Sequence, residues 1–136
     1  MIKEKTIGVT TVAFSKNEAL MAKLKAKGFK KVKRNEDLKR FTKQELIQFL
    51  SDCDGAIVGL DMMSEEVLSQ LPKLKVISKY GVGLNNIDFE ACKKYDVKVL
   101  HTKGVNKRSV SEMALGFMLS LSRNLYTTSN LLKQNT

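Results

Sequence analysis

Short apolar runs alternate along the chain with longer segments whose apolar residues recur at helical spacing. The short runs are rich in Val and Ile, and they predict strands at residues 6–14, 29–34, 55–60, 74–80 and 97–100. The longer segments predict helices at residues 17–28, 42–53, 63–72 and 86–95. Thr42 and Glu45 have the spacing of a capping box, and Ser64 is a second predicted helix cap.

This alternation of strands and helices predicts an α/β fold. The run at residues 55–60 is continuously apolar, which is typical of a strand buried on both faces. We therefore expect a flavodoxin-like, doubly wound parallel sheet of five strands, with helices on both faces. Ligands of such sheets bind beyond the carboxyl ends of the strands. The loops that follow residues 80 and 100 are expected at that edge.

The last part of the chain has a different pattern. Residues 109–132 predict one long helix, with Ser109 and Glu112 in another capping-box pattern. Large apolar side chains crowd its middle: Met113, Phe117, Met118 and Leu121. A helix that is apolar nearly all round needs burial on more than one side, which a five-stranded domain does not provide. We expect self-association into a homo-oligomer, with exchange of this helix between chains as one form.

Composition bounds the class of protein. The chain has 136 residues, enough for one core, and its 43% hydrophobic and 28% charged residues are ordinary for a soluble domain. No apolar run approaches the roughly 20 residues of a membrane helix, and the N-terminus lacks a signal-peptide core. A cytoplasmic location without a membrane partner is expected. Cys53 and Cys92 are expected to be free buried thiols, and with one histidine no metal site is predicted.

The formal net charge of +10 raises the question of a polyanionic partner. The lysines are spread along the chain, and the densest stretch, residues 23–40, contains a single aromatic residue, Phe29. It therefore offers no stacking platform for single-stranded nucleic acid. Solvated lysines explain the charge more simply, so a nucleic-acid partner is not expected, and polyanion binding stays an alternative.

Gly81 and Gly83 follow the fourth predicted strand. A dinucleotide fingerprint needs a third glycine where Asn86 stands, and it follows the first strand of a sheet, so this interpretation is excluded. Two interpretations remain open from the residues alone. The pair is a tight turn that needs positive φ. Alternatively, its bare backbone N–H groups, with the helix start near residues 85–88, bind an anion such as a carboxylate.

Three motifs in order carry a resemblance to a known family. They are GVGLNNID at residues 81–88, HTKGVN at 101–106 and VSE at 110–112. Together with the flanking strands and helix, residues 74–124 resemble the D-isomer-specific 2-hydroxyacid dehydrogenase family, which includes phosphoglycerate dehydrogenases. The family pattern has Asp where Asn85 stands and Pro where Lys103 stands.

The resemblance implies roles for particular residues. The backbone of Val82 and Gly83 would bind the substrate carboxylate, and Asn106 would lie near the substrate. Val82 and Val110 would border the nicotinamide of NAD or NADP. The complete enzyme would transfer a hydride between this cofactor and C2 of a 2-hydroxy or 2-oxo acid. No residue of this chain is implied to be catalytic, and His101 is not the family's catalytic histidine.

The resemblance also divides the chain. Residues 1–105 would form the substrate-binding domain, and residues 106–136 a helix that leads to a dinucleotide-binding domain absent from this sequence. The family's cofactor fingerprint and catalytic Arg, Glu and His would follow residue 136. We therefore expect the chain to be inactive alone and to bind no nicotinamide cofactor strongly. The alternative, based on net charge and the apolar helix, is a non-enzymatic basic binding or oligomerisation module.

Overall fold

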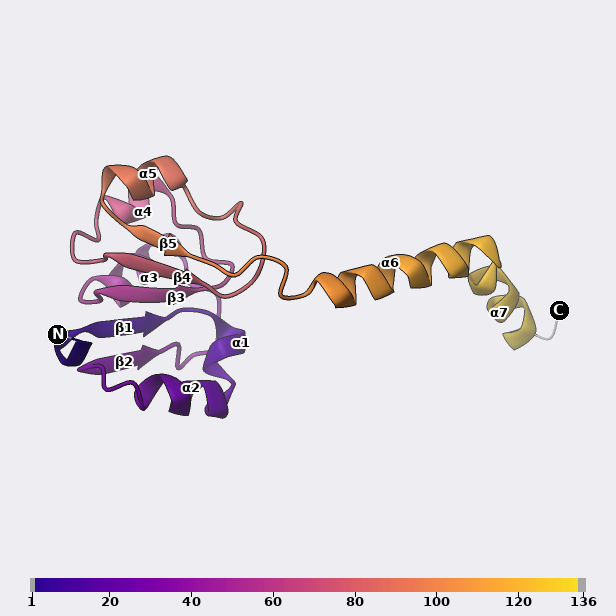
Figure 1. The fold of residues 1–136 in the computed structure, drawn as a ribbon, viewed down its shortest axis with the longest axis horizontal. Coiled ribbons are helices and arrows are strands. Elements are labelled where there is room, and N and C mark those ends of the chain that lie inside the picture. Colours follow the sequence, from indigo (N-terminus) through magenta and orange to yellow (C-terminus); the bar gives the residue numbers. More distant parts are fainter. Residues whose placement is uncertain (1, 135–136) are drawn as a thin grey trace. The chain divides into compact units, whose positions relative to one another are not determined.

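The computed structural model describes residues 2–134 and divides into two compact units, residues 1–102 and 103–136 (Figure 1). Residues 1, 135 and 136, which the domains predicted from the sequence include, lie outside the described residues. The predicted domain boundary after residue 105 stays a prediction.

The first unit is built on one parallel sheet. Its strands are β1 (Thr6–Val9), β2 (Lys31–Arg34), β3 (Gly55–Val58), β4 (Val76–Lys79) and β5 (Lys98–Leu100). Their order across the sheet is β2-β1-β3-β4-β5, and every neighbouring pair is parallel. Val9 is in register with Arg34 on one side and with Ile57 on the other. The prediction of a flavodoxin-like, doubly wound sheet is confirmed.

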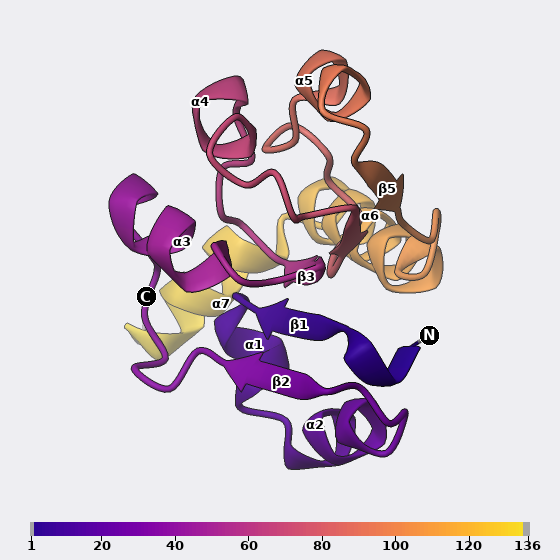
Figure 2. The ribbon, with the colours of Figure 1, turned by 90° about the vertical axis from the view of Figure 1, so that its left-hand side faces the viewer.

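Helices lie on both sides of this sheet. They are α1 (Val12–Ser15), α2 (Glu18–Lys25), α3 (Lys43–Leu50), α4 (Glu65–Leu68) and α5 (Phe89–Lys94), after a 3-10 turn, η1 (Ile2–Glu4). In Figure 2, α3, α4 and α5 lie along one side and α2 lies on the other, beside β2. The chain moves from β1 to β2 in the opposite direction to its later crossovers, so right-handed connections place the first helices on the opposite face.

The main core lies between the sheet and α3–α5. Its buried side chains include Leu46, Leu50, Ala56, Val58, Met63, Val67, Leu68, Ile77, Ala91 and Cys92. Burial of one such aliphatic side chain stabilises the fold by about 1.5–3 kcal/mol. Cys53 and Cys92 are free and buried, as predicted. Burial raises the pKa of the Cys53 thiol to about 11 and also raises that of Cys92, so both are unreactive core groups.

One local prediction in the first unit is wrong, and another is only partly met. The strand predicted over residues 6–14 ends at Val9, because the chain turns at Thr10 and Thr11 into α1. The Thr10 N–H still bonds the Ile57 carbonyl at 3.0 Å, but its hydroxyl bonds Asp61, so a tertiary contact overrides the strand propensity of these residues. Ser64 stands at the N-cap position of α4, as predicted, but its side chain makes no cap bond. The capping box of α3 is confirmed.

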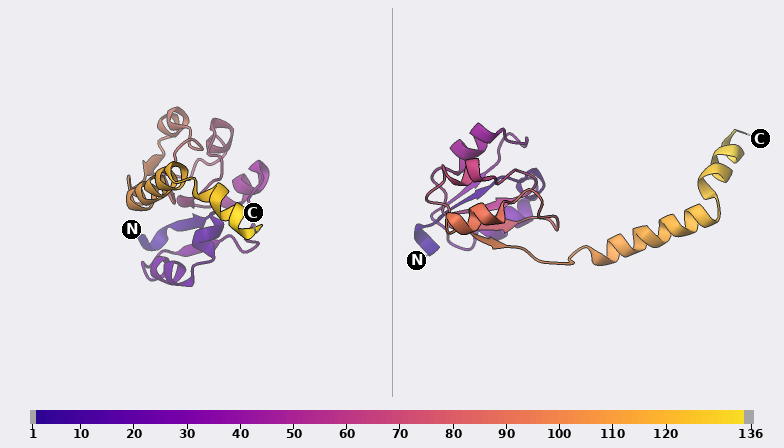
Figure 3. Two further views of the ribbon diagram at one scale, coloured as in Figure 1. Left: turned by 90° about the vertical axis from the view of Figure 1, so that its right-hand side faces the viewer. Right: turned by 90° about the horizontal axis from the view of Figure 1, so that it is seen from above.

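The second unit contains two helices, α6 (Lys107–Ser122) and α7 (Leu125–Lys133), which meet in a bend (Figure 3). The single helix predicted over residues 109–132 is therefore wrong. The break falls at Asn124, whose φ of 52° is left-handed. Asn tolerates this conformation better than most residues, because its short polar side chain can bond locally.

The capping box predicted at the start of this helix is also wrong. Gly104 adopts a φ of 69°, and its carbonyl accepts the Lys107 N–H at 3.1 Å. This turn lets α6 begin two residues before Ser109. Glu112 then lies within the helix and pairs with Arg108 at 2.8 Å.

Candidate functional site

The loop after β4 has a conformation that its sequence requires. The last sheet bond at this edge joins the Tyr80 N–H to the Val58 carbonyl at 2.8 Å. Gly81 then adopts a φ of 131°, which side chains rarely permit. A Cβ on Gly83 would lie 3.4 Å from the Asn85 Oδ1 atom, at the limit of ordinary van der Waals contact. Gly81 therefore shapes the turn, and Gly83 keeps the backbone beyond it bare.

This loop presents free hydrogen-bond donors. Val82 and Gly83 are exposed, and Val82 retains 41% of its accessible surface. Within residues 2–134, neither of their backbone N–H groups is bonded to another group of the chain. Backbone donors without a partner are satisfied by water or by a ligand, and carboxylates bind strongly to such groups. The loop can therefore receive an anion.

A buried side-chain network fixes the loop in place. Lys79 donates to the Oδ1 atom of Asn86 at 2.6 Å and to the Gly59 carbonyl. Asn86 in turn donates to the carbonyl of Asp61 at 2.6 Å and to that of Gly59 at 3.2 Å. Both side chains are buried, so these bonds replace those lost from water. The network joins the loop after β4 to the segment after β3.

The backbone joins the same two segments. The Met63 N–H bonds the Asn86 carbonyl at 2.8 Å, and the Asp88 N–H bonds the Met63 carbonyl at 3.1 Å. Asp88 then caps α5 by accepting the Ala91 N–H at 2.9 Å. The far end of the loop is therefore held rigidly, while its exposed apex keeps free donors.

Lys79 also sets the electrostatics of the loop. Its Cε atom lies 3.7 Å from where a Cβ on Gly81 would be, so the side chain runs beside the turn. Burial lowers the pKa of Lys79, and attraction to Asp61 opposes this shift. A cation in this partly desolvated place favours an anion at the loop more than a solvated lysine would.

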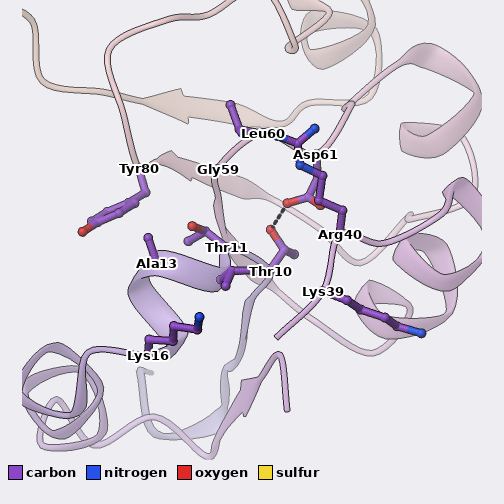
Figure 4. A pocket seen from close by; sticks show the side chains of 11 residues that line it. Thr10, Thr11, Ala13, Lys16, Lys39, Arg40, Gly59, Leu60, Asp61 and Tyr80 are labelled. Atoms are coloured by element: carbon purple, nitrogen blue, oxygen red, sulfur yellow. Dashed lines mark hydrogen bonds between the residues drawn. The ribbon is translucent and has the colours of Figure 1, made fainter. Parts of the chain in front are cut away.

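A cavity of about 550 Å³ opens at the carboxyl ends of β1, β3 and β4 (Figure 4). The sheet order reverses between β1 and β3, and ligands of doubly wound folds bind at such a point. Thr10 and Asp61 lie at its centre, where the Thr10 Oγ1 atom donates to the Asp61 carboxylate at 2.6 Å. Tyr80, which precedes the glycine loop, forms part of its wall.

The residues that the sequence points to fall in different units. Val82 and Gly83 belong to the first unit, whereas Asn106 and Val110 belong to the second. Asn106 precedes α6 and makes no side-chain cap bond, and Val110 is 56% exposed. A site that joins all four residues stays a prediction. His101 follows β5 and is half-buried.

Sequence reasoning missed the groups that support the loop. The sequence pattern predicts Lys79 only as part of a strand, Asn86 only as part of a motif, and Thr10 as part of a longer strand. Two signals could have found them. A lysine at the end of an otherwise apolar strand needs buried acceptors. A polar residue that ends the first strand of a doubly wound sheet lies at the ligand-binding edge.

Comparison with known proteins adds to this geometry. Residues 8–134 match the family described as D-isomer specific 2-hydroxyacid dehydrogenase, catalytic domain. The chain is 34% identical over 85 residues to D-3-phosphoglycerate dehydrogenase of Sus scrofa, and 32% identical over 93 residues to hydroxypyruvate reductase of Thermotoga maritima. These matches cover 62% and 68% of the chain but only 16% and 30% of the relatives.

A solved structure is also similar to this chain. The NAD⁺-bound 3-phosphoglycerate dehydrogenase of Entamoeba histolytica superimposes with a TM-score of 0.68 and 31% identity, over 86% of this chain and 39% of that one. The strand order places the molecule among the doubly wound α/β domains. The chain belongs to the D-isomer specific 2-hydroxyacid dehydrogenase family, a family of oxidoreductases, so the resemblance is confirmed. No helix in residues 2–134 is long and apolar enough to cross a membrane.

Proposed function

We propose that the chain is the substrate-binding part of a nicotinamide-dependent 2-hydroxyacid dehydrogenase. The observation that carries this proposal is the pair of free backbone N–H groups at Val82 and Gly83, on a loop held by buried side chains. Family membership and the names of the relatives support it. In the complete enzyme a hydride would move between NAD or NADP and C2 of the acid.

The chain's residues bind and orient the substrate. The N–H groups of Val82 and Gly83 hold its carboxylate, which fixes the direction of the neighbouring C2 atom. Lys79 holds these donors in place through Asn86, and its charge favours the anion. Asn106 approaches the substrate from the second unit.

The described residues do not fit the pyrophosphate of a dinucleotide. Asn86 stands where a third glycine would be needed, and its amide donates to the carbonyls of Gly59 and Asp61 instead of facing a ligand. When bound, the cofactor supplies the hydride acceptor or donor. This chain would contribute only apolar contacts with the nicotinamide, through Val82 and Val110. We therefore propose that the chain alone binds NAD or NADP weakly and is not catalytic.

An amide NMR titration tests the carboxylate loop. Oxalate and small 2-oxo acids should shift the amide signals of residues 81–83, with millimolar affinity. Lys79→Met should weaken this binding by about 3- to 10-fold, because the buried charge beside the loop is lost. Lys43→Met is the matched control, since Lys43 is an exposed lysine paired with Glu66. The absence of any shift in the amide signals of residues 81–83 with every acid would contradict the proposal.

A turnover assay tests the lack of catalysis. The 136-residue chain should not oxidise NADH in the presence of any 2-oxo acid of the panel. Turnover above that of a Gly81→Val variant would show that the chain is an enzyme by itself.

The exposed apolar face of α6 supports self-association as a second property. Met113, Phe117, Met118 and Leu121 are 58–82% exposed. We propose that this face packs against another copy of the chain, which sedimentation over a concentration series would detect. A monomer at all concentrations would contradict it. A purely basic binding module instead predicts steeply salt-dependent heparin binding, and its absence at low salt would remove that alternative.

A further inference from the structure

Lysines stand at the starts of the strands, at the end of the sheet opposite the glycine loop. We call them the amino-edge row: Lys5, Lys30, Lys31, Lys73, Lys75 and Lys98. Backbone bonds align the segments that carry them, since the Lys30 N–H bonds the Lys5 carbonyl at 3.0 Å. Farther along, the Lys75 N–H bonds the Asp54 carbonyl at 2.8 Å, and the Lys98 N–H bonds the Lys75 carbonyl at 2.9 Å. The row therefore crosses the sheet from β2 to β5, over about 19 Å at the usual strand spacing of about 4.8 Å.

Few acids neutralise this row. Asp54 is buried in its middle, where its carboxylate pairs with Lys5 at 3.0 Å and with Lys73 at 3.8 Å. Asp96 pairs with Lys75 at 3.9 Å. These two acids leave the row with an excess of positive charge, which attracts anions.

Three lysines of the row differ from the others in their surroundings. Lys30, Lys31 and Lys98 are exposed and make no ion pair within residues 2–134. A further acid of this region, Asp52, is already paired with Lys33 at 2.6 Å. Three cations in line are therefore available to a ligand.

Protection of the sheet edges explains only part of this pattern. Lysines on edge strands prevent pairing with other sheets, and β2 and β5 are the edge strands here. This accounts for Lys31 and Lys98. It does not account for Lys5, Lys73 and Lys75, which precede the inner strands β1 and β4.

The other side chains at this edge restrict the kind of ligand. Among the described residues of segments 2–5, 29–31, 73–75 and 96–98, one large apolar side chain is exposed, that of Ile2. The turn η1 adds Lys3 and Glu4, which have opposite charges. A membrane-binding surface would insert several apolar residues beside its lysines, and a protein that binds single-stranded bases would stack them on exposed aromatic rings. The row therefore fits a ligand that is bound through its charges alone.

From this arrangement we propose that the amino-edge row binds a linear chain of phosphate groups, as in inorganic polyphosphate or a nucleic-acid backbone, without recognition of bases. One strand of a duplex carries a phosphate about every 3.4 Å along its axis, so the row spans about five of them. The sequence-based expectation of no nucleic-acid partner considered only the contiguous lysines of residues 23–40. The row is invisible there, because its lysines come from separate segments.

This property is independent of the proposed function. The glycine loop follows the carboxyl end of β4, whereas Lys73 and Lys75 precede the amino end of the same strand. A 2-oxo acid and a phosphate chain therefore bind at opposite ends of the sheet. Neither ligand displaces the other.

Fluorescence anisotropy of a short labelled oligothymidylate with the 136-residue chain tests the proposal. The three unpaired lysines, with one share from Lys5 and Lys73 around Asp54, neutralise about four phosphates. The logarithm of the affinity should therefore fall with the logarithm of salt concentration with a slope of about −3, at about 0.7 for each phosphate of a single strand. An absence of binding at low salt would overturn the proposal.

Two competitors identify the chemistry of the ligand. Inorganic polyphosphate should displace the oligonucleotide, and the tighter of the two at equal phosphate content identifies the source of the phosphates. Poly-L-glutamate of similar charge should compete less well, because its carboxylates lie on flexible side chains that must be ordered on binding. Equal competition by poly-L-glutamate would assign the row to acidic protein segments and so overturn the phosphate assignment.

A triple variant assigns the binding to the row. Lys30→Gln combined with Lys31→Gln and Lys98→Gln removes the unpaired cations, and the slope should fall to about −0.7. These side chains are exposed and make no ion pair within residues 2–134, so the fold should be retained. Circular dichroism verifies this. An unchanged slope would place the binding elsewhere and contradict the proposal.

The matched control removes three lysines outside the row. Lys16, Lys103 and Lys107 are exposed and likewise unpaired within the described part of the chain. Their replacement by Gln changes the net charge by the same amount, and it should keep the slope near −3. An equal loss in the control would mean that net charge alone produces the binding, which overturns the row as a site.

Amide NMR separates this inference from the proposed function. The oligonucleotide should shift residues 30, 31 and 98, and oxalate should shift residues 81–83 equally in the unaltered chain and in the Lys30 triple variant. Oligonucleotide shifts at residues 81–83 in place of the row would overturn this inference. An absence of oxalate shifts would contradict the proposed function and leave the amino-edge row supported.

Discussion

The two units differ in the burial of their apolar residues. In the first, Leu50, Val58 and Ile77 are completely buried between the sheet and its helices. In the second, Phe117 is 60% exposed and Leu121 is 82% exposed, although α6 is at least as rich in apolar residues as α3. An apolar helix therefore becomes part of a core only when other elements surround it. The apolar surface of α6 is left for contacts outside its own unit.

The units also differ in how their helices begin. In the first, side-chain bonds to Asn17, Thr42 and Asp88 cap α2, α3 and α5, whereas the four-residue helices α1 and α4 begin without one. In the second, neither Asn106 nor Asn124 makes a side-chain cap bond. Uncapped, exposed helices open at lower free energy than buried ones. We therefore expect faster amide exchange in α6 and α7 than in the sheet.

The largest expected effect concerns two aliphatic residues, one from each unit. Ile77→Ala should lower the free energy of unfolding by about 2–5 kcal/mol, because it opens a cavity in a closed core. Leu121→Ala should change it by less than about 0.5 kcal/mol at low protein concentration, since the side chain is already in water. Urea unfolding followed by circular dichroism measures both. A comparable loss of unfolding free energy in both variants would mean that α6 is buried in solution.

A smaller effect, of opposite sign in the two units, is expected for two glycines. Gly81→Ala should destabilise the chain by about 1–3 kcal/mol, because a side chain is strained at a φ of 131°. Gly116→Ala should stabilise the helical unit by about 0.5–1 kcal/mol, since Gly116 lies inside α6 and an added Cβ would meet open space. Thermal unfolding of both variants checks the signs. Stabilisation by Gly81→Ala would contradict the loop geometry and the site built on it.

The smallest effect concerns acid pH and the start of α3. Hydrogen bonds from Lys39 and then Thr42 lower the pKa of Glu45 to about 2 from its ordinary value of 4.5. A carboxylate whose pKa is lowered by folding stabilises the folded state fully above pH 4.5, and this contribution is lost as pH falls toward about 2. Amide exchange in the first turn of α3 should therefore accelerate across this range.

Glu45→Gln is the matched variant for this titration, and Glu112→Gln in α6 is its counterpart in the other unit. Glu45→Gln should abolish the pH dependence of amide exchange at the start of α3, and Glu112→Gln should leave it unchanged. An unaltered dependence in Glu45→Gln would assign it to another carboxylate.

Local sequence signals predicted much of the first unit. The apolar periodicity placed five strands and four helices, and Thr42 with Glu45 marked the start of α3 correctly. The same signals were wrong where tertiary contacts decide, as at Thr10, which leaves the sheet while its side chain bonds Asp61. They were wrong again at Asn124, because one residue in a left-handed conformation interrupts a pattern that is otherwise continuously helical.

The sequence by itself determined the fold class, the family and the glycine loop at the carboxyl edge, because these depend on residue types at fixed spacing along the chain. Only the tertiary structure showed what holds that loop and what adjoins it. Lys79 meets the carbonyl of Gly59, 20 residues earlier, and Lys16 and Arg40 line one cavity from two different loops. These contacts follow from the order of strands in the sheet, which brings together segments that are distant in the sequence. The local pattern of apolar and polar residues does not predict them.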